Sequence, residues 1–244
     1  MALRFKDATE AMASAFRILG EGQLSLTKFL IVLDREVDLA NLKAVLTHLL
    51  ERTHPETDLF IFSNVSMDTL DYTGPAVNEG SKGVWLGVGD PVRRLPSEFR
   101  PAVDLPRDAR DPRVFCPGCL VVGAPAFADD PGAAARLAEH AAFQEWPLVV
   151  VTDDPRRASA SAMNFLWTTF TRFEPGADVH SAAKRIVRNH VTFTPPIVLD
   201  ARLKPGFPKE LFADEATAEI VTRRWKEYFP SGVAMGDAAK GHLD

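Results

Sequence analysis

A lysine flanked by glycines, in the segment Gly80-Ser81-Lys82-Gly83, is the residue best placed to do chemistry. Glycines let a backbone approach a phosphate closely, and the lysine supplies a positive point charge. The order differs from a P-loop, because no GxxxxGK[ST] is present and we expect a strand over residues 84–88. The spacing alone favours a tight turn before that strand, yet Lys82 is the best isolated candidate for a ligand contact.

Two cysteines, Cys116 and Cys119, enclose a Pro-Gly pair. Zinc needs four ligands and no second pair exists, while a redox pair of the thioredoxin type opens a helix. This pair instead leads into the apolar run 119–124, which predicts a strand. We therefore favour a structural turn with reduced, buried thiols.

Adjacent carboxylates, Asp153 and Asp154, follow another apolar run at residues 148–152. The end of a parallel strand is where open α/β sheets bind ligands, but Asp154 stands before a proline and is explained as a helix cap. Arg172 and Glu174 sit at a predicted helix end and need no active site. The six histidines are dispersed and form no HExxH motif, so we predict no catalytic residue and no metal ligand.

Alternating strands and helices must position these residues. Strands are predicted at 27–33, 58–63, 84–88, 119–124, 148–152 and 196–200, and helices at 39–50, 131–145, after Asp154, at 178–189 and from Asp214. Asp38 and Asp130 are the expected caps of the first two helices. In the helix after Asp154, apolar side chains at 163, 166, 167 and 170 should pack on the sheet.

These elements predict an α/β fold with three layers, α/β/α, a mostly parallel sheet and a C-terminal helical arm. Residues 90–117 hold six prolines, which predicts a long irregular segment. The expected segments are a helical lead-in at 1–25, the α/β domain at 26–203, the arm with its helix at 204–230 and a loose tail at 231–244.

Composition limits the partners. The chain has 244 residues, a net charge of −5 and no strongly basic region, which argues against a nucleic-acid partner. The longest apolar runs are far shorter than a membrane helix, and residues 1–16 lack the apolar core of a signal peptide. We expect a cytoplasmic protein with no membrane partner.

Six ordered matches resemble the C-terminal region of UbiD-like decarboxylases, from about residue 11 to about residue 229. They are LTKFLIVLD (26–34) followed by VDL (37–39), then EGSKG (79–83), FCPGC (115–119), WPLVV (146–150), FLWTTFTRFEP (165–175) and IVLDARLKP (197–205). The resemblance implies reversible decarboxylation of unsaturated or aromatic acids with prenylated FMN, a divalent metal and potassium.

The same resemblance implies roles for a few residues here. Lys82 matches the lysine that approaches the cofactor in the family, so Gly80, Ser81 and Lys82 form the expected cofactor-binding segment. The family's C-terminal arm packs on a neighbouring subunit, which makes Trp225, Tyr228 and Phe229 the interface candidates of a homo-oligomer.

Two hypotheses follow. The family's catalytic arginine and two glutamates lie in a preceding region that this sequence does not contain. In the first hypothesis, the chain is part of a split decarboxylase and is inactive until another, flavin-binding chain completes it. In the second, it is a non-catalytic interaction or regulatory subunit, or a truncated product, with the same fold. The absence of an arginine with paired glutamates favours the second. Whether the chain is itself an enzyme stays open.

Overall fold

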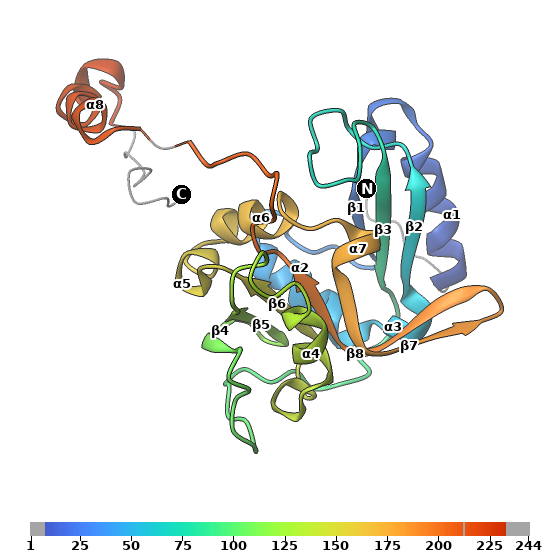
Figure 1. Ribbon diagram of the computed structural model, residues 1–244. Coiled ribbons are helices and arrows are strands. Elements are labelled where there is room, and N and C mark those ends of the chain that lie inside the picture. The colour runs from blue at the N-terminus through green and yellow to red at the C-terminus, as the bar shows by residue number, and fades with distance from the viewer. Residues whose placement is uncertain (1–7, 212, 233–244) are drawn as a thin grey trace.

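The computed structural model describes residues 8–211 and 213–232 (Figure 1). The strands are β1 (Phe29–Leu33), β2 (Leu59–Val65), β3 (Gly80–Gly87), β4 (Arg110–Cys116), β5 (Cys119–Gly123), β6 (Leu148–Thr152), β7 (Val179–Val187) and β8 (His190–Asp200). The α-helices are α1 (Ala8–Leu19), α2 (Leu42–Arg52), α3 (Pro55–Asp58), α4 (Ala133–Glu139), α5 (Pro155–Ala158), α6 (Ala162–Phe170), α7 (Pro175–Asp178) and α8 (Glu215–Tyr228). Two 3₁₀ turns, η1 (Gly22–Leu26) and η2 (Ala141–Phe143), complete the set.

The strands form two mixed sheets and not one mostly parallel sheet, so that part of the predicted fold was wrong. The first sheet has the order β1-β3-β2, with β1 parallel and β2 antiparallel to β3. The second has the order β4-β5-β6-β8-β7, in which β5, β6 and β8 run parallel and both edge strands run antiparallel. The strand, helix and strand predicted between residues 119 and 152 form the parallel β5-α4-β6 unit, whereas β1 and β2 do not pair with each other and lie on either side of β3.

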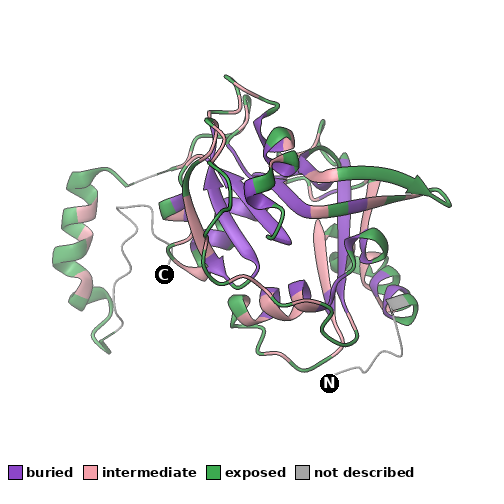
Figure 2. Ribbon diagram, turned by 90° about the horizontal axis from the view of Figure 1, so that it is seen from below, coloured by how far each residue is buried: buried purple, intermediate pink, exposed green. Residues whose placement is uncertain are grey.

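The main hydrophobic core lies between the two sheets. Phe29 of β1 contacts Trp85 of β3 and, from the other half, Phe170 and Phe173 with ring centroids 5.9 and 5.6 Å apart. A single cluster of buried side chains joins α2, β3, β5, β6 and β8. Smaller clusters lie under α1 and under α4. The buried strands stand out in the burial view (Figure 2).

The predicted helix over 178–189 is the strand β7, which forms a long hairpin with β8. The turn consists of Arg188 and Asn189, both with positive φ, 51° and 63°. Two such residues match the twist of an antiparallel pair, and asparagine tolerates this conformation well. In Figure 1 the hairpin projects from the body. The segment at 90–117 is irregular as predicted up to residue 109, but its end forms β4.

Helix starts agree only partly with prediction. Asp154 caps α5 by accepting the Arg157 N–H at 3.0 Å, as expected. Asn41 and not Asp38 caps α2, through the Ala44 N–H. The helix predicted from 131 to 145 is broken into α4 and η2, and α4 begins after Gly132 with no side-chain cap.

The predicted face of α6 is correct only at Phe170, which packs against the core. Met163, Leu166 and Trp167 are 52%, 38% and 47% exposed, while Phe165 is buried in the core. Phe165 stacks on Phe115 of β4, with ring centroids 4.0 Å apart. The helix starts at the Ser161 cap, and this short element turns its aromatic side chain at 165 inward.

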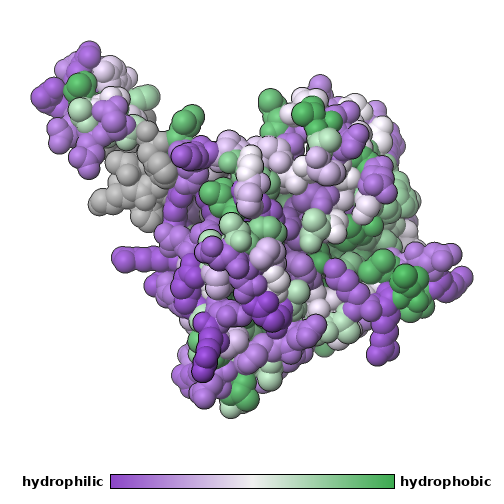
Figure 3. All heavy atoms as spheres, viewed as in Figure 1, coloured by the Kyte–Doolittle hydropathy of each residue, from purple (hydrophilic) through white to green (hydrophobic). Residues whose placement is uncertain are grey.

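The predicted C-terminal helix is confirmed as α8, capped by Asp214. It stands apart from the body at the end of the arm, and it contains no buried residue among those described (Figures 1 and 2). In the space-filling view its surface is mostly hydrophilic with a few hydrophobic side chains (Figure 3). No helix of the described ranges is both long and apolar enough to cross a bilayer.

Candidate functional site

The predicted segment at 80–82 opens β3 beneath the buried side chain of Met67. A β-carbon at Gly80 would lie only 1.7 Å from the Met67 sulfur. Glycine is therefore required at this position by the close approach of another side chain.

The hydroxyl of Ser81 ties β3 to the turn before β7. It donates to Glu174 Oε1 and accepts the Gly176 N–H at 2.6 Å. Glu174 also caps α7 by accepting the Ala177 N–H at 2.8 Å. Ser81 and Glu174 are both buried. The Ser81 hydroxyl is thus engaged by protein groups and holds the start of β3 in place.

The ammonium of Lys82 is the buried cation of this segment. It donates to the carbonyl oxygen of Thr27 at 3.0 Å, and 6% of the residue is exposed. Burial lowers the pKa of Lys82, while the nearby negative charge of Asp71 acts in the opposite direction. Within the described part of the chain, no carboxylate lies at ion-pair distance from Lys82. Because an ammonium has three donors, it can accommodate an anionic ligand group.

A second lysine, Lys28, lies next to Thr27 and already has its counter-ion. Its ammonium contacts Asp71 at 2.8 Å and Thr73 Oγ1 at 3.3 Å. Burial lowers the pKa of Lys28, and Asp71 opposes that effect. Burial alone would raise the pKa of Asp71, but hydrogen bonds from Lys28 and Thr73 outweigh it and leave that pKa lowered. Lys28 is therefore paired with Asp71, whereas Lys82 has no ion-pair partner of its own among the described residues.

An open cavity of about 840 Å³ adjoins this cluster. The start of β3, the preceding loop and α7 line it, with side chains or backbone of Ser63, Asn64, Thr73, Asn78, Glu79, Gly80, Glu174 and Gly176. Thr73 connects the cavity wall to the Lys28–Asp71 pair. The wall is rich in hydroxyl, amide and backbone groups, which suits a polar ligand.

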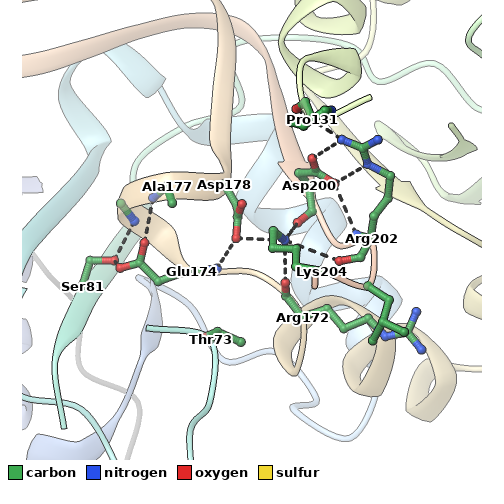
Figure 4. A network of polar contacts seen from close by, with 12 residues as sticks. Thr73, Ser81, Pro131, Arg172, Glu174, Ala177, Asp178, Asp200, Arg202 and Lys204 are labelled. Atoms are coloured by element: carbon green, nitrogen blue, oxygen red, sulfur yellow. Dashed lines mark hydrogen bonds and ion pairs between the residues drawn. The ribbon is translucent and has the colours of Figure 1, made fainter. Parts of the chain in front are cut away.

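A chain of polar contacts leads from the cavity wall to the second sheet (Figure 4). Asp178 accepts the Glu174 N–H at 2.7 Å and pairs with Lys204 at 3.1 Å. Burial raises the pKa of Asp178 to about 6, against the lowering effect of Lys204. Lys204 also donates to the carbonyl oxygens of Arg172 and Asp200, at 2.8 and 2.9 Å.

Sequence reasoning missed Glu174, Asp178 and Lys204 as members of one cluster. Glu174 was interpreted only as part of a helix end, although the segments around 174 and 204 both carry the family resemblance. A local signal did exist, because Pro175 follows the capping Glu174, and Asp178 accepts the backbone N–H of Glu174. The same arrangement occurs at α3, where Asp58 accepts the His54 N–H at 2.7 Å.

The other sequence candidates are structural where the structure tests them. Cys116 and Cys119 face each other across a hairpin whose turn contains Gly118 at φ +78°, so the predicted turn is confirmed. Both thiols are buried and unbridged, and burial raises the pKa of Cys119. Asp153 does not act with Asp154, since it accepts the Leu203 N–H and pairs with Arg172. Within the described ranges, no three His, Cys, Asp or Glu residues are grouped as metal ligands.

The predicted interface residues lie on or next to α8. Tyr228 and Phe229 are 45% and 41% exposed, and the ring of Trp225 contacts that of Phe229 in a tilted arrangement with centroids 4.5 Å apart. Their role at an interface stays a prediction.

Comparisons with known proteins agree with the motifs. Residues 2–87 match the family described as the 3-octaprenyl-4-hydroxybenzoate carboxy-lyase C-terminal domain. An uncharacterized protein of Chlamydia trachomatis is 47% identical over 91% of this chain and 37% of its own length. A Chlamydia pneumoniae protein, named as one of the subunits of a 4-hydroxybenzoate decarboxylase, is 41% identical over 91% of this chain and 37% of its own length.

This chain thus spans a little over a third of the length of these relatives. Among solved structures, the vanillic acid decarboxylase of Sedimentibacter hydroxybenzoicus is similar over 47% of this chain and 28% of that chain. Its sequence identity is 18% and its TM-score 0.28, values too low to support an argument.

Proposed function

Because this chain carries the C-terminal region of a UbiD-like decarboxylase, we propose that it forms the cofactor-flanking and subunit-packing portion of such an enzyme. The observation that carries the proposal is the buried ammonium of Lys82, which has no ion-pair partner among the described residues and follows the cavity-lining Gly80 by two positions on β3, within the residues that match the family. The family's catalytic arginine and glutamates would come from the remaining part of the relatives' length.

The residues present fit an anionic cofactor. Lys82 has N–H donors beyond the one that Thr27 receives, and Lys28 is already neutralised by Asp71, so Lys82 would face a phosphate or another anionic group. Gly80 and Ser81 would shape the segment, since Met67 and Glu174 fix their positions. Prenylated FMN, when bound, would supply the decarboxylation chemistry itself.

The substrate class we propose is an aromatic or unsaturated carboxylic acid. The Chlamydia pneumoniae relative is named for 4-hydroxybenzoate and as one of several subunits, which supports an aromatic acid and an assembly of more than one kind of polypeptide. A flavin-binding region, on the same or on another polypeptide, would complete the active site.

We also propose that α8 is covered by a neighbouring subunit. A helix without buried residues gains little stability from its own chain, and an amphipathic helix is normally stabilised by packing. Trp225, Tyr228 and Phe229 would supply the contacts. A chain that ends after residue 213 should therefore form a smaller oligomer than the full chain, as measured by the molar mass in light scattering, while its body stays folded.

The decisive test uses the assembled enzyme with Lys82→Ala. We expect flavin retention after gel filtration to fall about tenfold, equivalent to about 1.4 kcal/mol, because a charge-assisted hydrogen bond is lost. Lys82→Arg should retain most of the flavin, and Lys43→Ala on the exposed side of α2 should retain all of it. Unchanged retention in Lys82→Ala would leave Lys82 as a residue of β3 whose ammonium only bonds to the Thr27 carbonyl oxygen.

The alternative function, a non-catalytic interaction protein, predicts a different composition of the purified protein. Co-purification with a partner and a flavin absorbance band supports the decarboxylase assembly. A colourless homo-oligomer supports the interaction protein. Flavin bound tightly by this chain alone would contradict the view that another region holds it.

A further inference from the structure

A second cavity, of about 490 Å³, lies at the carboxyl ends of the three parallel strands. Ala126 lines it after the end of β5, Thr152 at the end of β6 and Leu203 after the end of β8. Open α/β sheets bind ligands at this edge, because the loops that follow parallel strands converge there. Its volume is suited to a small organic molecule.

Two arginines in this cavity hold one carboxylate, that of Glu210. Arg172 Nη2 donates to Glu210 Oε1 at 2.5 Å, and Arg157 Nη1 donates to Glu210 Oε2. Each carboxylate oxygen thus receives its own guanidinium. Burial would raise the pKa of Glu210, but the two arginines outweigh it and lower that pKa, so Glu210 is ionised at neutral pH.

Glu210 differs from the other two carboxylates of the cavity in how it is held. Asp154 accepts the backbone N–H of Arg157, and Asp153 accepts that of Leu203 at 2.7 Å, so both belong to the local fold. Glu210 lies on the arm, where Phe207 and Glu210 alone among residues 205–211 are partly buried. It can leave without disturbing either sheet.

The cavity offers further groups to a ligand. The hydroxyl of Thr152 is buried and has no hydrogen-bond partner among the described residues. A buried hydroxyl without a partner is unfavourable, and a ligand or a water molecule would satisfy it. Ala126 and Leu203 give the wall an apolar part, and Lys209 adds a third cation at the rim.

We propose that this cavity binds a small organic carboxylate, which takes the place of Glu210 between Arg157 and Arg172. The ligand's apolar part would lie against Ala126 and Leu203. Because Glu210 must leave, binding would release the part of the arm after Phe207, which carries α8, while Phe207 stays packed on Tyr72. Glu210 would then be an internal competitor that links occupancy of the cavity to the freedom of the arm.

The test measures binding of sodium benzoate to the full chain by calorimetry, with inorganic phosphate as a second probe. Glu210→Gln removes the competing charge and should bind benzoate at least tenfold more tightly than the natural chain. Arg157→Gln, when added to that variant, should bind it at least tenfold more weakly than Glu210→Gln alone. Glu219→Gln, on the exposed surface of α8, should not change the affinity.

Localisation comes from amide chemical shifts of the labelled Glu210→Gln chain, where benzoate should move Thr152, Asp153 and Leu203. The amide spectrum also reports that each variant is folded. No benzoate binding by folded Glu210→Gln, or shifts confined to other regions, would overturn the proposal and leave Glu210 as an arm anchor. Binding of phosphate but not of benzoate would overturn it as well, because the site would then take an inorganic anion.

Discussion

Two glutamates of this chain are both fully engaged, yet their surroundings differ. Glu174 is buried between the two sheets and bonds to Ser81 and to a backbone N–H of α7. Glu210 is partly exposed on the arm and bonds only to side chains among the contacts described. The first contact joins β3 to α7 between the two sheets, whereas the second joins a mostly exposed segment of the arm to α5 and the end of α6. A similar number of bonds therefore has a structural role in one region and an exchangeable role in the other.

The largest effect should come from breaking the buried contacts at Lys204. Lys204→Met leaves the buried Asp178 without its cation and removes a donor from three backbone carbonyl oxygens. We expect a loss of about 3 to 5 kcal/mol in unfolding free energy at pH 7.5. Urea unfolding measures it, with Lys226→Met on α8 as the control. The loss should shrink at pH 5, where Asp178 becomes protonated; equal losses at both pH values would contradict the assignment.

Asp178 should give the buried region a pH dependence. Its folded pKa of about 6 lies above the ordinary value of 3.8, so the folded state holds this proton more tightly than the unfolded state. Its contribution to stability is therefore present below about pH 4 and is lost as pH rises to about 6. The unfolding free energy of the natural chain minus that of Asp178→Asn should fall by about 2 to 3 kcal/mol over this window. A flat difference would show that Asp178 titrates normally.

Ser81→Ala should have an intermediate effect. The change leaves the Gly176 N–H and one oxygen of Glu174 buried with one partner fewer. A loss of about 1 to 3 kcal/mol in unfolding free energy is expected. Ser66→Ala, at an exposed position before β3, should stay within about 0.5 kcal/mol of the natural chain. A loss no larger than that of the control would mean that the Ser81 hydrogen bonds contribute nothing to the unfolding free energy.

The parts of the fold that could be predicted are those that local sequence determines. The continuous apolar runs of β5 and β6 identify buried parallel strands, and Asp154 before Pro155 identifies a helix start. The hairpin of β7 was missed because its alternation is weak and Arg188 seldom adopts a positive φ. The face of α6 was missed because a single helix cannot reveal which side the rest of the chain covers.

In the candidate site too, the features set by local sequence could be predicted and those set by long-range packing could not. Lys82 could be identified from its glycine-flanked segment, but its buried neighbours could not. Ser81 and Glu174 are 93 positions apart, and Arg172 and Glu210 come from different elements 38 positions apart. Contacts of this range depend on how the two sheets pack, which no local pattern encodes. The pairing of Arg157 and Arg172 around one carboxylate therefore appeared only in the structure.

The smallest effect on stability should come from Glu210→Gln, and it sharpens the comparison most. A partly exposed ion pair contributes at most about 1 kcal/mol, so the unfolding free energy should change by no more than that. The arm should nevertheless detach more often, by about fivefold for about 1 kcal/mol. Trypsin cleavage after the exposed Lys209 would measure this rate, with Glu219→Gln as the matched control. If Glu210→Gln instead lost as much stability as Lys204→Met, the contacts of Glu210 with the two arginines would be as important for the fold as the buried contacts of Glu174. The difference between the two glutamates would then disappear.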